Sequence, residues 1–419
     1  MIDDRRTIAA IATAPGRGAV AIVRVSGPDA FDIAERLTSR RPEPGRVAVR
    51  DVSFGGTLLD RCVVLAFAGP RSYTGEDSVE FQCHGGSVVP RRILEACFAA
   101  GARLANRGEF TERAFLNGRM DLSEAESVIE LVDAKTDRAA ADALARNGGS
   151  AARAYRALYD KTLQLSTTLE HALDVDEADL PPGFIENAAS AASAVEDEIV
   201  RALARAREGR ILRDGALVVL AGPPNAGKSS LMNALLGTSR AIVSAAPGTT
   251  RDSIEEWLDI NGWPVRLVDT AGLRGTSDEI EAEGVRRAEA LISKADVVLA
   301  LDCDVDGAIS VHSKCDLGRK EGVLNVSSVT GGGLDNLKDA IVKRLAALGA
   351  AASEDTPTPS AREISLLEEA REALARQADD IVLMANSART AADALARLVG
   401  ATYSDDLLDS LFSRFCVGK

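Results

Sequence analysis

The hydrophobic pattern changes twice along the chain. In residues 8–118, short apolar runs at 20–23 and 63–67 alternate with glycine and proline turns and with helix-like stretches such as 88–100. Apolar runs of this length between turn residues are typical of strands, whereas three- and four-residue spacing is typical of helices. The first part of the chain is therefore predicted to form a small α+β domain.

Two later blocks have a helical pattern. In residues 121–207, strand signals vanish and alanine, leucine, glutamate and arginine dominate. The same character returns in residues 360–398, after a linker at 354–359 that contains two prolines. Both blocks are predicted to form long amphipathic helices, because their apolar residues recur every three or four positions. In the first block these residues include Leu158, Leu163, Leu165, Leu169 and Leu173.

The segment between the two helical blocks alternates strands and helices. Strand-like runs at 217–220 and 265–268 are each followed by a helix-like stretch, and a third run follows at 297–301. This alternation indicates a parallel sheet with helices packed on it. The simplest arrangement is an α/β domain inserted into a split helical domain. The predicted domains are residues 1–118, residues 119–210 with 355–419, and residues 211–354.

One connection in the predicted sheet is short. Only six residues separate Leu301 from Ala308, whereas a parallel crossover usually takes a dozen or more and contains a helix. Six extended residues span about 20 Å, enough to return along a strand of about 17 Å. The sequence therefore predicts that one crossover helix is missing, and that this face of the sheet is exposed or covered by another element.

Composition narrows the function classes. The chain of 419 residues carries 63 acidic and 49 basic residues, a net charge of −14, which excludes a protein that coats nucleic acid through bulk positive charge. Residues 1–118 alone contain 16 arginines, no lysine and 14 acidic residues, so a nucleic-acid partner remains compatible with local basic surfaces. No apolar run approaches about 18 residues, and the first residues lack the pattern of a secretory signal. We expect a cytoplasmic protein with no membrane partner.

The six cysteines are scattered and show no zinc or redox spacing. They are expected to be reduced thiols, mostly in the core.

A phosphate-binding loop follows the strand at 217–220. Residues 222–230 read Gly-Pro-Pro-Asn-Ala-Gly-Lys-Ser-Ser, which matches the pattern Gly-x4-Gly-Lys-Ser. The glycines let backbone N–H groups converge on phosphates, and the next helix presents its positive N-terminus. Lys228 is expected to bridge the β- and γ-phosphates, and the Ser229 hydroxyl to bind Mg²⁺.

Two further motifs follow in the order of a GTPase. Residues 248–252 read Gly-Thr-Thr-Arg-Asp, where a hydroxyl can reach Mg²⁺ when a γ-phosphate is present. Residues 269–272 read Asp-Thr-Ala-Gly, the turn that senses the γ-phosphate through the N–H of Gly272. The three motifs together predict a Ras-like GTPase domain.

The base-recognition motif departs from the usual Asn-Lys-x-Asp. The chain has Ser313-Lys314-Cys315-Asp316, which keeps the carboxylate that reads guanine N1–H and the 2-amino group and the lysine that stacks on the base. We expect that the short hydroxyl of Ser313 cannot bridge to the phosphate loop as an amide does, which would lower affinity. Ser327 and Ser328 stand where a backbone contact to guanine O6 is expected.

The group that orients the attacking water must differ from that of Ras. The position after Asp-x-x-Gly is Leu273, which cannot hydrogen-bond to water. A carboxylate in the acidic stretch 277–283, such as Glu281, could hold the water, or could equally favour a helix N-terminus through the helix dipole. The amide of Asn225 lies in the phosphate loop, where a monovalent cation could take the role of an arginine finger.

Longer motifs lie outside the GTPase segment. They are Ile-Ala-Ala-Ile-Ala-Thr-Ala-Pro-Gly-Arg-Gly-Ala-Val-Ala-Ile-Val-Arg-Val-Ser-Gly at 8–27, Tyr-Thr-Gly-Glu-Asp-Ser-Val-Glu at 73–80, His-Gly-Gly at 84–86, Gly-Glu-Phe-Thr-Glu-Arg-Ala-Phe-Leu-Asn-Gly-Arg-Met-Asp-Leu at 108–122, and Phe-Ser-Arg-Phe-Cys-Val-Gly-Lys at 412–419. With these motifs, the chain resembles the MnmE (TrmE) family of tRNA-modification GTPases over nearly its whole length.

The resemblance implies a homodimer joined through the N-terminal domains, whose G domains approach each other on binding GTP and K⁺. It implies that Glu281 positions water, with Lys228 and Thr250 as further catalytic residues. The implied metal ligands are Ser229 and Thr250 for Mg²⁺, and Asn225, Ser244, Ala246 and Thr249 for K⁺. The implied GTP contacts are Asn225, Ala226, Gly227, Lys228, Ser229, Ser230, Ser244, Ala245, Ala246, Pro247, Gly248, Thr249, Thr250, Asp269, Thr270, Ala271, Gly272, Lys314, Asp316, Ser327 and Ser328.

The resemblance also implies a folate-binding-like fold for the N-terminal domain, with a one-carbon tetrahydrofolate at the dimer interface. Its contacts would be Arg24, Glu80, Arg119 and Lys419, although Arg24 and Glu80 could equally be surface ion-pair residues. Relatives act with a flavin-containing MnmG-type partner, in a heterotetramer or larger complex, on C5 of the wobble uridine (position 34) of certain tRNAs. FAD would be held by that partner alone.

Two alternatives stay open at this point. The Cys416 thiolate could attack uridine C6 as a nucleophile, or the residue could be a buried cysteine that packs the tail into the dimer interface. An Era-like ribosome-assembly GTPase switch would share the GTPase motifs, but it would need an RNA-binding module that the N-terminal half does not resemble.

Overall fold

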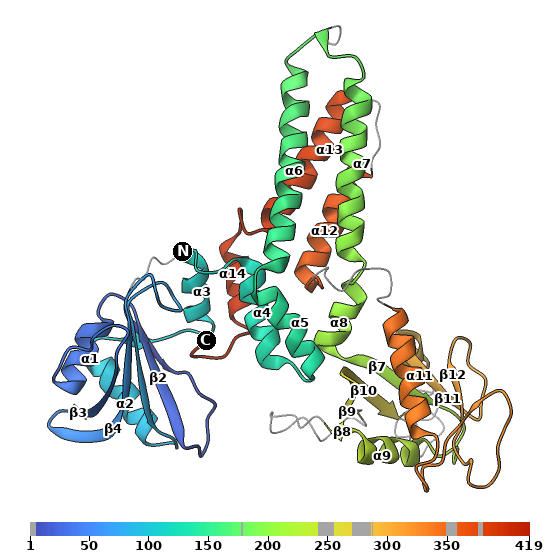
Figure 1. Ribbon diagram of the computed structural model, residues 1–419, viewed down its shortest axis with the longest axis horizontal. Coiled ribbons are helices and arrows are strands. Elements are labelled where there is room, and N and C mark those ends of the chain that lie inside the picture. The colour runs from blue at the N-terminus through green and yellow to red at the C-terminus, as the bar shows by residue number, and fades with distance from the viewer. Residues whose placement is uncertain are drawn as a thin grey trace. The chain divides into compact units, whose positions relative to one another are not determined.

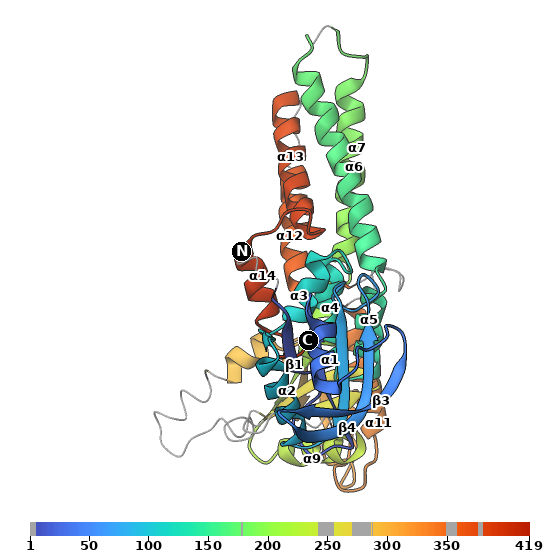
Figure 2. The same ribbon diagram turned by 90° about the vertical axis from the view of Figure 1, so that its left-hand side faces the viewer.

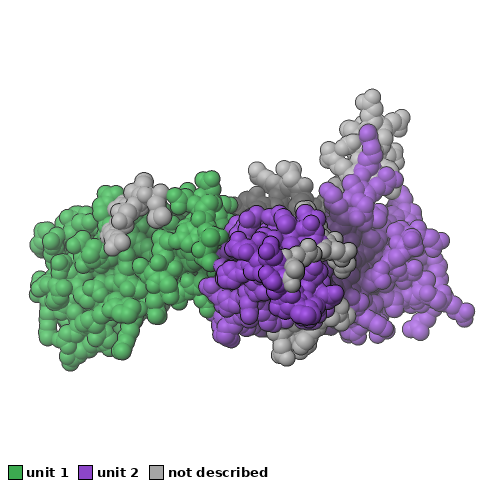
Figure 3. All heavy atoms as spheres, turned by 90° about the horizontal axis from the view of Figure 1, so that it is seen from above, with its two compact units in different colours: residues 1–129, 399–419 green, residues 130–398 purple. Residues whose placement is uncertain are grey.

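A computed structural model describes residues 6–176, 179–241, 255–269, 286, 288–348, 358–375 and 380–419. The chain forms two compact units, residues 1–129 with 399–419 and residues 130–398, which are coloured separately in Figure 3.

The first unit contains a six-stranded sheet with helices α1 and α2 packed on it (Figure 1). Its strand order is β3-β4-β5-β2-β1-β6, and every pairing is antiparallel except that of β1 with β6. The apolar runs predicted at 20–23 and 63–67 lie in β2 and β4, so this part is the α+β fold that was predicted. The elements are β1 (Ile8–Ile11), β2 (Val20–Ser26), α1 (Ala30–Thr38), β3 (Val47–Phe54), β4 (Thr57–Phe67), β5 (Ser78–His84), α2 (Val89–Ala99) and β6 (Arg103–Leu104).

Segments from the two ends of the chain complete this unit. Helix α3 (Glu109–Leu116), the start of α4 (Leu122–Asp133) and α14 (Asp405–Phe412) share one apolar cluster. In it, Leu122 and Phe412 are buried although 290 residues separate them in sequence. The C-terminal segment is thereby held close to the N-terminal sheet domain.

The second unit begins with the helical part. Helices α6, α7 and α13 run side by side in Figures 1 and 2. On α6, Leu158, Leu165 and Leu169 are buried, but Leu163 and Leu173 are 43% exposed, so the predicted apolar face was partly wrong. These two residues lie off the stripe that repeats every three or four positions. The helices are α5 (Asp137–Asn147), α6 (Ser150–Leu173), α7 (Phe184–Leu203), α8 (Ala206–Asp214), α12 (Ala361–Leu374) and α13 (Ile381–Leu398).

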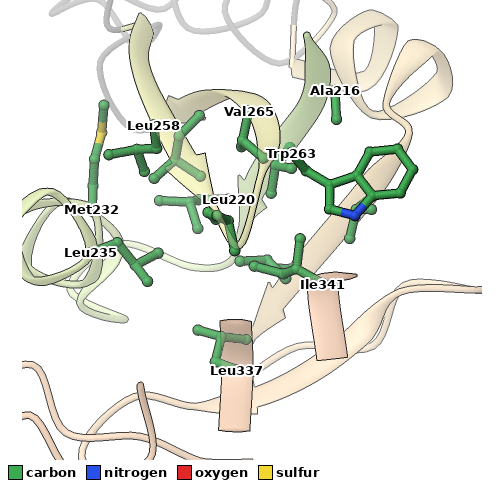
Figure 4. Packing of buried hydrophobic residues seen from close by; sticks show 14 of the residues in the cluster. Ala216, Leu220, Met232, Leu235, Leu258, Trp263, Val265, Leu337 and Ile341 are labelled. Carbon is green, nitrogen blue, oxygen red and sulfur yellow. The ribbon is translucent and has the colours of Figure 1, made fainter. Parts of the chain in front are cut away.

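A seven-stranded sheet forms the other part of this unit, in the order β13-β12-β11-β7-β10-β9-β8. The five strands from β13 to β10 are parallel, whereas β9 and β8 are antiparallel to their neighbours. Helices α9 and α11 cover one face, and Figure 4 shows Leu235 and Ile341 packed with Leu220 and Val265. The elements are β7 (Ala216–Ala221), α9 (Lys228–Thr238), β8 (Arg240–Ala241), β9 (Glu255–Ile260), β10 (Trp263–Asp269), β11 (Val297–Leu301), β12 (Ile309–His312), β13 (Leu324–Asn325) and α11 (Leu334–Ala347).

The prediction that one crossover helix is missing is confirmed. Strand β12 pairs in parallel with β11, and residues 302–308 connect them without a helix. Val311 is buried in the core under α11, so the alternating side chains Ser310 and His312 lie on the opposite sheet face. That face therefore carries polar residues on β12 where a crossover helix would need apolar ones.

Candidate functional site

The phosphate-binding loop connects β7 to α9. Helix α9 begins at Lys228, and its N-cap Gly227 has φ +85°. A Cβ at Gly222 would lie 2.5 Å from the Leu301 carbonyl oxygen, so this position requires glycine. The loop thus turns sharply at the end of a buried strand and directs the N-terminus of α9 at the space above it, as phosphate binding requires.

Lys228 lies over this loop. Its side chain is buried, and its ammonium donates hydrogen bonds of 2.8 Å to the carbonyl oxygens of Gly222 and Pro223. An ammonium held against the loop at a helix N-terminus is placed to contact phosphate oxygens of a nucleotide.

Ser229, in the first turn of α9, and Asp269, the last residue of β10, come together. The Ser229 hydroxyl donates to Oδ2 of Asp269 at 2.6 Å, and Asp269 is 2% exposed. They meet because β7 and β10 pair in parallel, which brings their carboxyl ends to the same sheet edge. A hydroxyl and a carboxylate at this edge form the oxygen donor set that Mg²⁺ prefers.

The structure corrects the expectation for Ser313. Its hydroxyl is buried and donates a hydrogen bond to the Ala226 carbonyl in the phosphate loop. The expectation that a short hydroxyl could not reach was wrong, because the backbone lies so close that a Cβ on Gly227 would be 3.0 Å from the Ser313 hydroxyl oxygen. Ser313 therefore makes the bridge that an asparagine amide makes in the usual motif.

The remaining base-recognition residues are also linked to this loop. Lys314 donates to the Asn225 carbonyl at 3.0 Å, and Asp316 accepts from the Ser327 hydroxyl at 2.6 Å. That hydrogen bond from Ser327 is the main cause that lowers the pKa of Asp316. The buried hydroxyl oxygen of Ser328 has no hydrogen-bond partner among the described residues.

Several predicted site residues lie outside the described residues. They are Ser244, Ala245, Ala246, Pro247, Gly248, Thr249, Thr250, Thr270, Ala271, Gly272 and Glu281. Their roles stay predictions.

A second group of predicted residues lies on β2 and β5. Arg24 and Glu80 face each other across these strands, and both Nε and a terminal nitrogen of Arg24 lie 2.9 Å from Oε1 of Glu80. The Arg24 guanidinium also lies 5.4 Å from the ring centre of Tyr73 and 5.6 Å from that of Phe110. Both aromatic residues stand in motifs quoted above, but the sequence alone did not indicate that they flank Arg24.

The C-terminal tail reaches the same group. Arg24 donates to the Gly418 carbonyl at 3.4 Å, and the Lys419 carbonyl accepts from the Phe110 N–H at 3.2 Å. Gly418 has φ +99°, and a Cβ there would lie 2.5 Å from the Ile11 carbonyl oxygen. Arg24, Glu80 and the tail are therefore neighbours.

Arg119 is placed by a different contact. A Cβ at Gly75 would lie 3.1 Å from Cγ of Arg119, so this arginine packs against the loop that follows Tyr73. The described contacts do not join Arg119 directly to Arg24 or Glu80.

The cysteines fall into three classes of exposure, and all six are free. Cys62, Cys83 and Cys97 are buried, and burial raises the pKa of Cys62 and Cys97 to about 12 and that of Cys83 to about 11. Cys303 and Cys315 are half-buried, so core placement holds for half of the six. Cys416 is exposed within a single copy of the chain.

Comparison with known proteins gives matches over the whole chain. Residues 7–119 match the family described as GTP-binding protein TrmE N-terminus, and residues 122–416 match the MnmE helical domain. The tRNA modification GTPase MnmE of Symbiobacterium thermophilum is 42% identical to this chain, and the alignment covers 99% of each of the two chains. The chain belongs to the MnmE family. The protein of the same name from Alkalilimnicola ehrlichii is also 42% identical, over 99% of this chain and 100% of its own.

This MnmE-family chain is shorter than those relatives. The alignment with the Symbiobacterium protein runs over 462 positions, whereas the chain has 419 residues, so at least 43 positions are gaps in it. Among solved structures, the G domain of the T. maritima FeoB iron transporter is 30% identical over 31% of this chain and 98% of its own, with a TM-score of 0.23 that supports no conclusion.

The family match does not favour the Era-like alternative. Residues 7–119 match the TrmE N-terminus, so the part of the chain that would have to carry an RNA-binding module is accounted for. None of the described helices has the length and apolar character of a membrane span, and no group of three or more His, Cys, Asp or Glu side chains with the geometry of a metal site occurs among the described residues.

Proposed function

We propose that this MnmE-family protein hydrolyses GTP and couples that hydrolysis to tRNA modification. With a flavoprotein partner of the MnmG type, it would add an aminomethyl-type group at C5 of the wobble uridine of certain tRNAs. The observation that carries the proposal is the family match over both the N-terminal and the helical domain, joined to a phosphate loop whose Lys228 and Ser229 are held at the N-terminus of α9.

The proposal assigns the three domains distinct tasks. Residues 1–118 would bind the folate and form the dimer, residues 119–210 with 355–419 would connect the domains, and residues 211–354 would bind GTP.

In the GTP site, Lys228 would contact the β- and γ-phosphates, and Ser229 and Thr250 would hold Mg²⁺. Bound Mg²⁺ neutralises charge on the phosphate oxygens. Ser229 fits this task because its hydroxyl already faces the buried carboxylate of Asp269, and carboxylate and hydroxyl oxygens are suitable ligands. Lys314 and Asp316 would select guanine.

Glu281 would position the attacking water, since Leu273 cannot. Asn225, with the backbone at Ser244, Ala246 and Thr249, would hold K⁺, which supplies positive charge of the kind that an arginine finger supplies elsewhere. Asn225 is exposed and has φ +63°, and its own carbonyl oxygen accepts a hydrogen bond from the Lys314 ammonium. GTP turnover should be several times faster in K⁺ than in Na⁺ at equal ionic strength; equal rates would contradict the cation site.

In the N-terminal domain, Arg24, Glu80, Arg119 and Lys419 would bind a one-carbon tetrahydrofolate at the interface of a homodimer. Both contacts of Glu80 with Arg24 use Oε1, and Oε2 of Glu80 accepts no hydrogen bond within the described residues. An oxygen of this kind suits a pterin N–H donor, whereas Arg24 suits a folate carboxylate. When bound, the folate would bring a one-carbon unit to the site.

The decisive experiment is nucleoside mass spectrometry of tRNA from cells that lack this chain. We expect the modified wobble uridines to disappear and to return when the chain is supplied in trans. The Lys228→Ala variant, supplied the same way, should fail to restore them. Wobble uridines that are unchanged after deletion would overturn the proposed function.

A further inference from the structure

The segment that carries the base-recognition residues is closed by polar side chains. Oδ1 of Asp302 accepts from the Lys320 ammonium at 2.6 Å and lies 2.9 Å from Nδ1 of His312. Nε2 of His312 lies 3.1 Å from the Gly318 carbonyl oxygen. Asn325 exchanges two hydrogen bonds with the backbone of Lys320, at 2.8 and 2.7 Å. We call Asp302, His312, Lys320 and Asn325 the polar clasp.

The polar clasp lies at both ends of the recognition loop, residues 313–319. His312 directly precedes Ser313, and Lys320 follows the loop, while Asp302 is the first residue after β11. Asp302 has φ +52° and its N–H donates to the Val311 carbonyl at 3.1 Å. One carboxylate at the end of β11 therefore holds the start and the end of the loop together.

This arrangement stands where the crossover helix is missing. Residues 302–308 are too few to form a helix and also return along the strand, and β12 places His312 on the sheet face that a crossover helix would cover. Burial raises the pKa of Asp302, but the hydrogen bonds from Lys320 and His312 outweigh burial and lower it. The carboxylate is therefore charged at neutral pH, and charge-assisted hydrogen bonds are the stronger kind.

We propose that Asp302 and His312 are positioning residues for guanine recognition, holding Lys314 and Asp316 in place through the recognition loop. The proposal rests on the GTP-binding function proposed above. Neither residue touches the base. Their effect reaches it through Asp316, whose carboxylate would accept from guanine N1–H and from the 2-amino group.

Inosine diphosphate separates positioning from general stability, because hypoxanthine lacks the 2-amino group. If the polar clasp positions Asp316, disrupting the clasp removes the affinity that Asp316 gains from the 2-amino group of guanine. We therefore expect Asp302→Ala to weaken GDP binding about tenfold and IDP binding less than about threefold, as for the loss of hydrogen bonds to a charged group. Titration calorimetry of the full-length chain with each nucleotide measures the ratio.

Two further variants complete the design. Lys320→Met removes one arm of the polar clasp from a side chain that is 55% exposed, so it tests the proposal in a chain that folds even if Asp302→Ala does not. Its preference for GDP over IDP should also fall, by a smaller factor. Asp306→Asn is the matched control, since this exposed carboxylate in the same connection has no hydrogen bond or ion pair among the described residues; its ratio should stay unchanged.

A double variant decides between the explanations. In an Asp316→Ala background, Asp302→Ala should weaken GDP binding by less than about twofold, because the group that it positions is gone. An equal loss of GDP and IDP affinity, or the same loss with and without Asp316, would overturn the positioning role. A native chain that binds GDP no better than IDP or ATP would instead contradict the proposed GTP function.

Discussion

At the scale of single residues, Ser313 shows how a short side chain can replace a longer one. Its hydroxyl reaches the Ala226 carbonyl because the backbone of the phosphate loop approaches it closely. Since the hydroxyl is buried, removing it leaves a buried acceptor without a partner, and such a loss costs about 1–3 kcal/mol.

We therefore predict that Ser313→Ala lowers affinity for GDP by about 5- to 150-fold, the range that corresponds to this cost. Ser310→Ala is the matched control, because Ser310 lies on β12, the strand that directly precedes Ser313, and makes no side-chain hydrogen bond within the described residues. Fluorescence titration with a labelled GDP measures both variants. Equal affinities for Ser313→Ala and the native chain would mean that the hydroxyl contact is irrelevant to binding.

Glu281 carries the second prediction at this scale. If it positions the attacking water, Glu281→Ala should abolish GTP turnover and leave GTP affinity within about twofold. If it only favours a helix N-terminus, the variant should keep its turnover and lose at most about 1 kcal/mol of stability. Glu279→Ala, in the same acidic stretch, should retain turnover in either case and serves as the control for phosphate-release assays.

At the scale of elements, the hairpin β9–β10 is held by cations from the helical part of the same unit. The Lys135 ammonium lies 4.0 Å from the ring centre of Trp257, and the Arg138 guanidinium lies 4.0 Å from that of Trp263. Arg138 also donates to Glu208 on α8 at 2.7 Å. The hairpin leads from the predicted Mg²⁺-contacting threonine motif to the Asp-x-x-Gly motif, so these contacts join the GTP site to the helices.

We predict that Arg138→Ala destabilises the second unit by about 1–2 kcal/mol. This figure combines the contact with Trp263 and the ion pair with Glu208, and it is kept low because solvent screens an arginine side chain that is 42% exposed. The chain has only two tryptophans, both on this hairpin, so tryptophan emission should change in the variant and urea unfolding can be followed by it. Arg156→Ala, which removes a guanidinium 5.9 Å from the Tyr159 ring, should change stability by less than about 0.5 kcal/mol. A native emission spectrum for Arg138→Ala would contradict the stacking contact.

Several elements of the seven-stranded sheet were predicted correctly from the sequence pattern and from the length of one connection. The runs at 217–220, 265–268 and 297–301 became β7, β10 and β11 because each is a mostly apolar stretch, with Arg266 as the one charged residue. The absent crossover helix followed from chain length alone. The polar clasp could not be predicted in this way. Its four residues are separated in sequence and are brought together in space only by the pairing of β11 with β12.

At the scale of the whole molecule, buried carboxylates make stability depend on pH. Burial raises the pKa of Glu109, but hydrogen bonds from Arg103, the Asn106 N–H and Arg113 outweigh burial and lower it. Glu208 behaves in the same way, with Arg205 and Arg138 as donors. A lowered pKa in the folded chain stabilises it above the ordinary carboxyl pKa, and this contribution is lost as pH falls through the folded value.

We predict that the chain loses stability as pH falls below about 4.5, the ordinary value for glutamate. Between pH 6 and pH 3, the free energy of unfolding should fall by about 1–2 kcal/mol less in Glu109→Gln than in the native chain, because the variant has no carboxylate to protonate at this position. Urea unfolding at both pH values measures the difference. Glu112 supplies the contrast, since burial raises its pKa, so Glu112→Gln should not reduce the loss. Identical pH profiles for Glu109→Gln and the native chain would contradict the role of Glu109.

The sequence by itself determined the fold class of each part, the strands β7, β10 and β11, the phosphate loop and the family, because these depend on local patterns and on motifs read along the chain. It also determined the missing crossover, since six residues cannot hold a helix and still return along a strand. Tertiary structure alone decided that Ser313 reaches the phosphate loop, that Arg24 pairs with Glu80 beside the C-terminal tail, and that Asp302 meets His312 and Lys320. Each of these contacts depends on distances between backbone segments far apart in sequence, and spacing along the chain does not specify those distances.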